Sequence, residues 1–313
     1  MSAIRRVLVV HNAYQHRGGE DTVVEAEIAL LRTHGHVVET YFRSNDDVGS
    51  LSSLTLAGQT LWSTRTPRDL ADLVARFQPD VIHAHNTFPL ISPSLYWAAD
   101  RAGVPVVQTL HNFRLMCLSA LFLRDGKVCE DCMGKVPWRG VALACYRGSL
   151  PASAALAGML MLHRSMGTWQ NKVTRYIALN EFCRNKFIAG GLPAHRIAIK
   201  PNFVDFDAPA EVKRAGFLFV GRLSTEKGID VLAGAVRNIK DTHLRVAGTG
   251  PDATCLEGIS GLTALGALSG DAVRVEMSRA MALVLPSIWY ENFPRTLVEA
   301  FACGLPVIAS RIG

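Results

Sequence analysis

The segment from residue 289 to residue 299 combines carboxylates, aromatic residues and a proline in a pattern that suits phosphate and sugar binding. It has the one-letter sequence WYENFPRTLVE and follows an apolar run at 282–285 that we expect to be a strand. Pro294 suits the first position of a helix, which leaves Glu291 in the preceding loop and places Glu299 in the helix. The N–H groups of a first helical turn bind anions, and carboxylates accept hydrogen bonds from hydroxyls. The segment therefore predicts a diphosphate site with a sugar on either side.

Cations and glycines follow two other runs that we expect to be strands. Arg222 comes directly after the apolar run 217–220, and Lys227 lies at the start of the next helix. Two such cations can neutralise a diphosphate, and arginine can do so with two parallel hydrogen bonds. Gly18 and Gly19 precede the first helix and allow backbone N–H groups to approach a phosphate. The alternatives are a soluble surface for the cations and an ordinary turn for the glycines.

Two further motifs have a less specific meaning. Gly248 and Gly250 follow an expected strand and resemble part of a dinucleotide fingerprint, but Pro251 argues for a glycine turn at a nucleotide pocket. His83 and His85 are two apart in a strand, so both side chains point to the same face of the sheet. Such a pair could bind a metal ion or act as a base. We interpret the two histidines as polar packing.

Four of the seven cysteines are spaced like the ligands of a structural metal. An odd number of cysteines and the absence of a secretory signal argue against a secreted disulfide framework. A tetrahedral zinc could hold together a segment, about 112–150, that has no clear helix or strand pattern. Buried thiols are the alternative. The candidate zinc ligands are Cys117, Cys129, Cys132 and Cys145.

Length and composition favour an ordered protein of two domains. The chain has 313 residues, 49% of them apolar and 19% charged, and a typical domain has about 150 residues. The longest apolar stretch, 150–162, is shorter than the roughly 20 residues that a membrane span needs. The short apolar run 7–10 is too brief for a secretory signal. We therefore expect a cytoplasmic protein.

The positive charge is concentrated in one third of the chain. Residues 101–200 contain 14 Lys and Arg against 4 Asp and Glu, whereas residues 201–313 contain 11 against 12. A basic segment attracts lipid headgroups, phosphorylated substrates or nucleic acid, but no nucleic-acid motif is recognisable and we expect no such partner. Because the segment surrounds the apolar stretch 150–162, we predict docking on an anionic membrane. The alternative is that this stretch is a helix buried in the core.

Short β-branched runs alternate with helical patterns along the whole chain, which predicts an α/β fold with parallel sheets. We expect an N-terminal domain at 1–200 and a C-terminal domain at 201–313, joined near the prolines of 201–215. The last expected strand, 307–309, has no helix after it, so we expect either that the second domain is incomplete or that a partner covers this strand. The expected strands are 7–10, 37–42, 81–84, 105–110 and 176–178, then 217–220, 244–247, 262–265, 282–285 and 307–309, with first-half helices starting near Gly19, Arg68, Ser92, Pro151 and Glu181.

Together these motifs resemble the retaining family 4 glycosyltransferases of the GT-B fold. That resemblance implies two doubly wound, Rossmann-like domains facing across a cleft, no metal for catalysis, and helices after residue 313 that this chain lacks. The motifs that carry it are Arg17 to Glu20, His83 to His85, Thr109 to His111, Lys200 to Asn202, Gly221 to Gly228, Gly248 to Pro251, and Glu291 with seven residues before Glu299.

The resemblance also assigns roles to residues. It implies that Arg222 and Lys227 hold the donor diphosphate, and that Glu299 binds the nucleotide ribose. Glu291 is expected to bind the transferred sugar, and His111 one of the sugar hydroxyls. Further donor-binding positions are Gly18, Gly19, Gly221, Gly250, Asn292, Phe293 and Leu297.

We therefore predict a glycosyltransferase that moves a hexosyl-type sugar from a nucleotide-diphosphate sugar to a glycan or lipid-linked acceptor. Retention of anomeric configuration and a role in surface or exopolysaccharide synthesis follow from the same resemblance. Because fold does not fix function, a nucleotide-sugar epimerase and a non-catalytic nucleotide-sugar-binding fragment remain alternatives. An epimerase needs no acceptor, which separates it from a transferase.

Overall fold

The computed structural model describes residues 5–15, 17–206, 212–239 and 241–313. The chain divides into two compact units. Unit 1 comprises Met1–Ala120 and Glu130–Pro201, and unit 2 comprises Leu121–Cys129 and Asn202–Gly313. Part of the expected linker, residues 207–211, lies outside the described residues.

Unit 1 contains a six-stranded parallel sheet with the order β2-β1-β3-β4-β7-β8. Each of the five strands expected in the first half is present, and β8 is an additional edge strand. The parallel sheet arises because a helical segment separates most of its successive strands. The strands are β1 (Arg6–Ala13), β2 (Val37–Ser44), β3 (Val81–Ala84), β4 (Val106–Thr109), β7 (Arg175–Ala178) and β8 (Ile197–Ile199).

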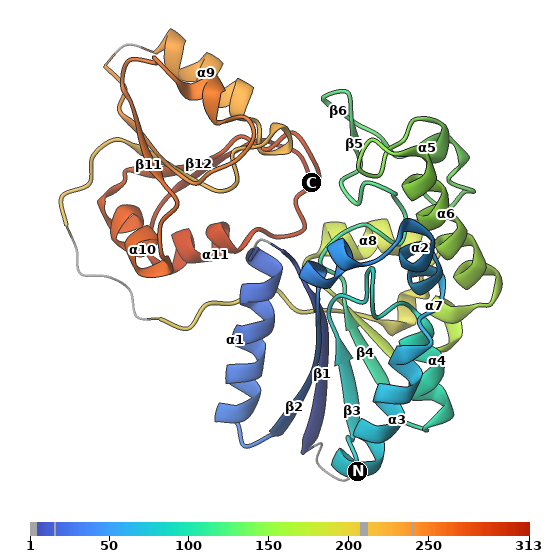
Figure 1. Ribbon diagram of the computed structural model, residues 1–313. Helices are drawn as coiled ribbons and strands as arrows, with labels where there is room; N and C mark the ends of the chain where they lie inside the picture. Colours follow the sequence, from blue (N-terminus) through green and yellow to red (C-terminus); the bar gives the residue numbers. More distant parts are fainter. Residues whose placement is uncertain (1–4, 16, 207–211, 240) are drawn as a thin grey trace. The chain divides into compact units, whose positions relative to one another are not determined.

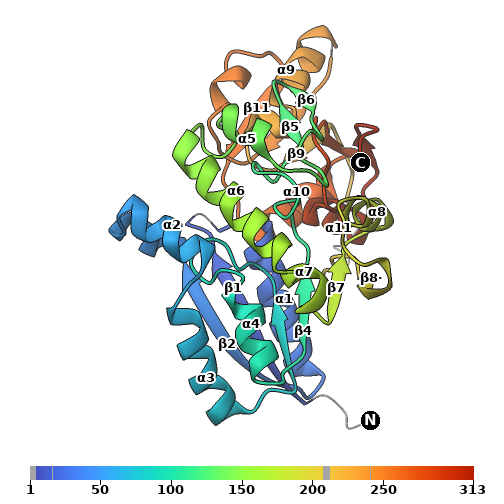
Figure 2. The same ribbon diagram turned by 90° about the vertical axis from the view of Figure 1, so that its right-hand side faces the viewer.

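Helices cover both faces of this sheet, with α1 on one side and α3 and α4 on the other (Figures 1 and 2). The inner strands are accordingly apolar on both faces. In β1, Val7 and Val9 pack with α1, and Leu8 between them is completely buried. The helices of unit 1 are α1 (Gly19–Thr33), α2 (Ser53–Leu61), α3 (Arg65–Phe77), α4 (Ser94–Arg101), α5 (Trp138–Ala142), α6 (Leu150–Ser165), α7 (Thr168–Asn171) and α8 (Glu181–Ala189), with 3-10 turns η1 (Asn45–Ser50) and η2 (Ala194–Arg196).

Unit 2 contains a five-stranded parallel sheet with the order β11-β10-β9-β12-β13. Its five strands lie where the sequence predicts them. They are β9 (Phe217–Val220), β10 (Leu244–Ala247), β11 (Leu262–Gly266), β12 (Ala282–Leu285) and β13 (Val307–Ala309). The helical elements are η3 (Thr225–Lys227), α9 (Ile229–Asn238), η4 (Ala253–Leu256), α10 (Gly270–Arg279) and α11 (Arg295–Ala302).

Successive residues of β9 pack into two separate hydrophobic cores, because side chains along a strand point alternately to opposite faces of the sheet. Phe219 packs with Ile229 and Leu232 of α9 on one face. Leu218 packs with Met277 of α10 and Ala300 of α11 on the other face. Strand β13 lies at the edge of the sheet, where Ile308 is 53% exposed.

The cysteine-containing segment is more regular than the sequence suggested. It contains the short helix α5 and a hairpin of β5 (Leu123–Arg124) and β6 (Lys127–Val128). Asp125 and Gly126 form the hairpin turn with φ angles of 51° and 70°. Positive φ at both turn residues is typical of a tight hairpin with an Asp-Gly pair, which explains why this short ribbon forms.

Candidate functional site

Glycine residues allow the loops after β9, β10 and β12 to pack backbone against backbone. A Cβ atom on Gly248 would lie 1.8 Å from the carbonyl oxygen of Gly221, and one on Gly250 would lie 2.1 Å from that of Leu223. A Cβ atom on Gly228 would lie 2.0 Å from a carbonyl oxygen in the loop after β12. Larger residues cannot fit at these positions without moving the loops. The glycines therefore assemble one continuous edge at the carboxyl ends of three strands, where open α/β sheets bind ligands.

Lys227 and Glu291 form an ion pair at this edge of the sheet. The Lys227 Nζ lies 2.6 Å from the Glu291 Oε1, and the Ser287 hydroxyl donates to the same oxygen at 2.7 Å. The Lys227 ammonium also lies 5.2 Å from the centre of the Trp289 ring. Both charged side chains are only about one-fifth exposed, at 23% and 17%. The pair can offer a cation to a phosphate and a carboxylate oxygen to a hydroxyl in the same small region.

Arg222 and the loop that contains Asn292 and Phe293 extend this site. Arg222 is exposed, and its guanidinium forms no ion pair with any residue that the structure describes. Asn292 is buried, and Phe293 has a φ angle of 108°, a conformation that costs about 1–3 kcal/mol for a residue with a side chain. The Phe293 carbonyl accepts a hydrogen bond from Asn202 Nδ2 at 2.8 Å. Such strain is typical of loops held in one shape for ligand binding.

Helix α11 begins at Arg295, one residue later than predicted, because Pro294 has the extended conformation of a capping residue. Glu291 lies in the loop and Glu299 in the helix, as predicted, and Leu297 lies between them in the first turn of the helix. The Glu299 Oε1 accepts a hydrogen bond from Arg295 Nε at 2.8 Å. The sequence analysis missed Arg295, although its spacing of four residues from Glu299 is a signal for a helical ion pair.

In unit 1, Gly18 and Gly19 lie at the start of α1, as predicted, and Gly18 is the capping residue. Asp21 Oδ2 accepts a hydrogen bond from the backbone N–H of Gly18 at 2.7 Å. The other carboxylate oxygen of Asp21 lies 2.8 Å from His11 Nε2. These hydrogen bonds lower the pKa of Asp21, against the opposing effect of burial. The Asp21 carboxylate therefore already accepts the hydrogen bond of the Gly18 N–H, and this contact fixes the shape of the glycine loop.

His83 of β3, His85 directly after this strand and His111 in the loop after β4 form a cluster with Glu27 of α1. His83, His85 and Glu27 are buried, and His111 is partly buried. His85 Nδ1 lies 2.9 Å from His111 Nε2, and His83 Nε2 lies 2.8 Å from the Thr109 hydroxyl. Burial lowers the pKa of His83 and His85, and it lowers that of His111 to about 3. All three imidazoles are therefore neutral near pH 7. His83 and His85 connect His111 to Glu27 of α1, and their interpretation as polar packing stays a prediction.

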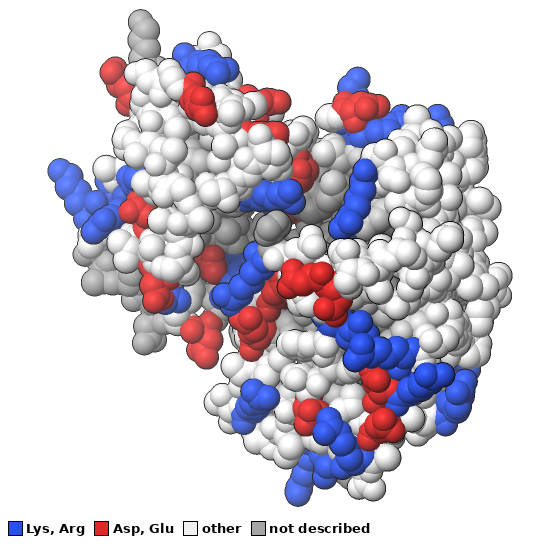
Figure 3. Space-filling view, in the orientation of Figure 1, with Lys and Arg blue, Asp and Glu red and all other residues white. Residues whose placement is uncertain are grey.

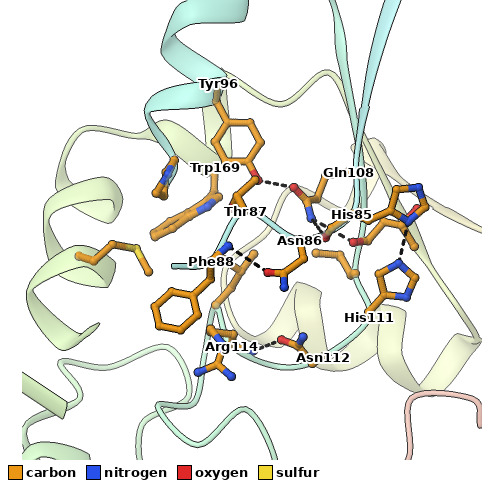
Figure 4. Close-up of a pocket in the computed structure, with 15 residues that line it drawn as sticks. His85, Asn86, Thr87, Phe88, Tyr96, Gln108, His111, Asn112, Arg114 and Trp169 are labelled. Carbon is orange, nitrogen blue, oxygen red and sulfur yellow. Dashed lines mark hydrogen bonds between the residues drawn. The ribbon is translucent and has the colours of Figure 1, made fainter. Parts of the chain in front are cut away.

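A pocket opens next to His111 at the carboxyl ends of β3 and β4 (Figure 4). One wall is polar: the Tyr96 hydroxyl donates to Gln108 Oε1, and Gln108 Nε2 donates to the His85 carbonyl at 2.8 Å. Arg114 supplies a cation, and its guanidinium lies 4.6 Å from the centre of the Phe88 ring. Apart from His85 and His111, the sequence analysis did not single out the pocket's polar residues. Its lining includes His85, Asn86, Thr87, Phe88, Tyr96, Gln108, His111, Asn112, Arg114, Met159 and Trp169.

The cysteines predicted to bind zinc are divided between the two units, because Cys129 belongs to unit 2. Cys117 and Cys132 are buried, and Cys129 and Cys145 are partly exposed. Among the described residues, the groups of three potential ligands within 4.8 Å comprise Glu27, His83 and His85, and no three cysteines. Zinc binding by the cysteines stays a prediction.

The apolar stretch 150–162 forms most of α6, and its middle belongs to the core of unit 1. Leu156 and Leu160 are 1% and 0% exposed, whereas Leu150 is 54% exposed. Trp138 of α5 is also exposed, at 65%. Figure 3 shows few charged side chains on the surface of unit 1 in the region of α5 and α6. Within the described part of the chain, no helix is both long enough and apolar enough to cross a membrane.

Comparison with protein families gives matches over both units. Residues 17–202 match the family described as "Glycosyl transferase 4-like domain", and residues 214–313 match "Glycosyl transferases group 1". The D-inositol 3-phosphate glycosyltransferase of Mycobacterium sp. strain KMS is 28% identical over 247 residues, which cover 75% of this chain and 52% of the relative. The phosphatidylinositol N-acetylglucosaminyltransferase gpi3 subunit of Schizosaccharomyces pombe is 28% identical over 204 residues, covering 59% and 44%. The chain thus spans about half the length of these relatives.

Solved structures of similar fold are glycosyltransferases of the GT-B type. Sucrose-phosphate synthase from Thermosynechococcus elongatus has a TM-score of 0.66 at 16% identity and covers 99% of this chain, which covers 82% of that structure. The lipopolysaccharide outer core galactosyltransferase WaaB has a TM-score of 0.61 at 18% identity, with coverages of 98% and 81%. HepE from Anabaena, in complex with UDP and glucose, has a TM-score of 0.61 at 17% identity, with coverages of 99% and 81%. These likenesses confirm the predicted GT-B fold.

Proposed function

This chain belongs to the family described as "Glycosyl transferase 4-like domain", and on that basis we propose what it does. The proposed reaction moves a hexosyl group from a nucleotide-diphosphate sugar to a glycan or lipid-linked acceptor. The observation that carries this proposal is the Lys227–Glu291 pair, in which a cation and a carboxylate lie 2.6 Å apart at the carboxyl edge of the unit 2 sheet. In a nucleotide-diphosphate sugar, a phosphate lies next to the hydroxyl groups of the sugar. The Lys227 ammonium suits the phosphate, and the Glu291 carboxylate suits the hydroxyl groups. The complexes of HepE with UDP and with UDP-glucose support a donor of this class.

In the proposed reaction, the bond between the sugar's anomeric carbon and the diphosphate oxygen breaks, and a bond to the acceptor oxygen forms. Arg222 and Lys227 stabilise the negative charge that grows on the leaving diphosphate. Glu291 orients the sugar through its hydroxyls, and Glu299 holds the nucleotide ribose. The proton of the acceptor hydroxyl passes to the departing phosphate oxygen. Since the acceptor attacks from the face that the diphosphate leaves, the anomeric configuration is retained without a protein nucleophile.

The acceptor side of the proposal rests on the pocket in unit 1. Its polar wall of Gln108 and Asn86 suits hydroxyl groups, and Arg114 suits a phosphate on the acceptor. Two relatives are named for transfer to inositol 3-phosphate and to phosphatidylinositol, which are a phosphorylated and a lipid-linked polyol. A glycan or lipid-linked precursor in surface or exopolysaccharide synthesis is an acceptor of the same chemical kind.

Incubation with a panel of radiolabelled nucleotide sugars, with and without a lipid extract, tests this function. We expect label from one donor to enter a lipid-extractable or polymeric product only when an acceptor is present. Arg222→Ala should abolish most of this transfer, whereas Arg237→Ala, an exposed arginine of α9, should not. Conversion of the donor to its epimer without any acceptor would replace the transferase by an epimerase. Donor binding without turnover in every mixture would indicate a binding protein.

A further inference from the structure

A chain of polar groups connects His111 to a buried carboxylate on α1. The side chain next to His111 in this chain of contacts is His85, whose Nδ1 lies 2.9 Å from His111 Nε2. The opposite nitrogen of His85, Nε2, lies 3.7 Å from Glu27 Oε2 and makes no hydrogen bond. His83 faces the same carboxylate oxygen through Nδ1 at 3.6 Å. The side chains of His85 and Glu27 are 0% and 4% exposed, so water does not mediate between them freely.

Lys200 fixes the orientation of the carboxylate. Its Nζ lies 2.5 Å from Glu27 Oε1, which leaves Oε2 facing the two imidazoles. An ionised carboxylate offers only acceptors, so the group opposite each free lone pair must bring a hydrogen. In an interior of low dielectric constant, an imidazole lone pair aimed at this oxygen would be repelled, whereas an N–H dipole would be attracted.

This requirement selects one tautomer for each neutral ring, because a neutral imidazole has one N–H and one lone pair. His85 places its N–H on Nε2, toward Glu27, so its Nδ1 is an acceptor. The neighbouring nitrogen, His111 Nε2, must then be the donor. The remaining nitrogen of His111, Nδ1, carries a lone pair and forms no hydrogen bond with the residues that the structure describes. His83 places its N–H on Nδ1, and the Thr109 hydroxyl donates to its Nε2.

We propose that Glu27 and His85 are positioning residues that set the tautomer of His111, so that His111 faces its ligand as a hydrogen-bond acceptor. The inference deepens the proposed function and rests on it for the identity of the ligand, a sugar hydroxyl. An acceptor nitrogen selects a group that carries a hydrogen. It discriminates against a carbonyl, an ether or a fluorine at the same position, because two acceptors would then face each other.

A metal ion is the competing occupant of this cluster, since the ligand atoms of Glu27, His83 and His85 lie within 4.8 Å of one another. Lys200 already supplies one positive charge for the one negative charge of Glu27. A divalent cation would leave two uncompensated positive charges among buried groups, which is unfavourable. The hydrogen-bond arrangement of Glu27, His85 and His111 needs no further ion.

Long-range proton–nitrogen NMR correlations of histidine-labelled protein report each tautomer directly. We expect His85 and His111 to be protonated on Nε2 and His83 on Nδ1, with assignments from His85→Gln, His111→Gln and His83→Gln. In Glu27→Gln, the amide oxygen will face Lys200 and the amide NH2 will face the imidazoles. His85 and His111 should then both change to the Nδ1–H form. The matched control, Glu39→Gln, makes the same change on the surface strand β2 and should leave all three tautomers unaltered.

Two results overturn the proposal: His111 protonated on Nδ1 in the native protein, or a native tautomer that Glu27→Gln does not change. About one metal ion per chain that is lost in His83→Gln would also overturn it in favour of a metal site. If Glu27→Gln does not fold, the native spectrum alone decides. These readouts need no turnover, so they remain decisive even if the proposed transferase activity fails.

Donor analogues provide the functional test. Replacing each sugar hydroxyl in turn by fluorine removes the hydrogen but keeps an acceptor. We expect the native protein to discriminate against fluorine at one position by about tenfold or more in kcat/KM, the range of a single hydrogen bond. Glu27→Gln should lose most of that preference at the same position and keep the preferences at the others. An unchanged preference pattern in Glu27→Gln would contradict the specificity role.

Discussion

Under the proposed function, Lys227 has one partner in the free protein and another in the reaction. In the resting state, its ammonium is paired with Glu291, which prevents an uncompensated charge in a site that is only one-fifth exposed. A diphosphate that enters can share this cation, while its sugar hydroxyls take the place of the ammonium as donors to Glu291. If the proposed reaction takes place here, the site is preorganised, so that little reorientation is needed when charge develops on the leaving group.

Replacement of Lys227 or of Arg222 by alanine tests this role in catalysis. Because the charge on the diphosphate grows in the transition state, we expect kcat to fall by about 10²–10³-fold while the donor Kd changes by less than about tenfold. Steady-state kinetics combined with calorimetric titration of the donor separate the two effects. Lys213→Ala, an exposed lysine in unit 2, is the control. A loss confined to donor affinity would show that the cations bind without catalysing.

Glu299 should act on a different part of the donor. A carboxylate that binds the ribose contacts the nucleoside and not the sugar, so Glu299→Ala should weaken the free nucleoside diphosphate about 10–100-fold, the range of hydrogen bonds to charged groups. Calorimetry with the nucleoside diphosphate alone measures this, and Glu257→Ala, an exposed glutamate, should have no effect. Weakening seen only with the intact nucleotide sugar would assign Glu299 to the sugar instead.

The buried histidines should make stability depend on pH. Burial lowers the pKa of His83 and His85, and that of His111 to about 3, so between about pH 3 and pH 6.5 the unfolded chain binds more protons than the native one. The free energy of unfolding therefore rises with pH in this window, by up to about 1.4 kcal/mol per pH unit for each histidine. Above the window, the histidines cause no further change. Urea unfolding at pH 5.5 to 7.5 measures the slope. His85→Gln should reduce it, and the exposed His34→Gln should not.

At the scale of elements, the inner strands were predictable because burial on both faces forces a run of apolar, often β-branched residues. All ten expected strands form, and Phe217 to Val220 is a clear case. The missed elements lack that signal: β8 has three residues, and Ala198 and Ile199 are exposed at the edge of the sheet. The β5–β6 hairpin had a signal in Asp125-Gly126, but its flanking strands are too short to show alternation.

The same reasoning explains which site residues the sequence could indicate. Residues in loops after strands, such as Arg222 and Glu291, could be singled out because the carboxyl ends of parallel strands meet at one edge. Glu27 was not found, because it lies two turns into α1 and on a helical wheel looks like a polar residue at the edge of an apolar face. Only the three-dimensional approach of α1 to β3 and to Lys200 gives it a role. Contacts between distant segments do not leave a local pattern.

The segment 112–150 contains the four cysteines that we predict to bind zinc. If its thiols bind zinc, elemental analysis of protein purified without added metal should find about one zinc per chain. A Cys129→Ser, Cys132→Ser double variant should lose the metal and melt at a lower temperature, because binding energy of a structural metal is folding energy. Cys255→Ser, in unit 2, is the matched control. Metal-free protein whose melting the double variant does not alter would identify the cysteines as packing residues.

On the scale of the whole molecule, most of the basic segment 101–200 belongs to unit 1, and residues 121–129 of it belong to unit 2. Residues 101–200 carry the excess of Lys and Arg, and the exposed Trp138, Leu143 and Leu150 lie within the same segment. Because the middle of α6 is core, docking on a membrane would have to use these exposed residues and not the whole apolar stretch. A lipid-linked acceptor would give such docking a purpose, since the acceptor's headgroup lies at the membrane surface.

Co-sedimentation with vesicles tests this arrangement. Each Lys or Arg that reaches an anionic surface contributes about 1 kcal/mol, so binding should increase with the fraction of anionic lipid and decrease with salt. Trp138→Ala should weaken binding, since the 65% exposed indole offers the largest apolar surface of this segment. Phe301→Ala removes a similarly exposed aromatic ring, at 61%, from unit 2 and should leave binding unchanged. If the native protein does not sediment with anionic vesicles at low salt, the exposed residues serve another purpose and the acceptor must reach unit 1 from solution.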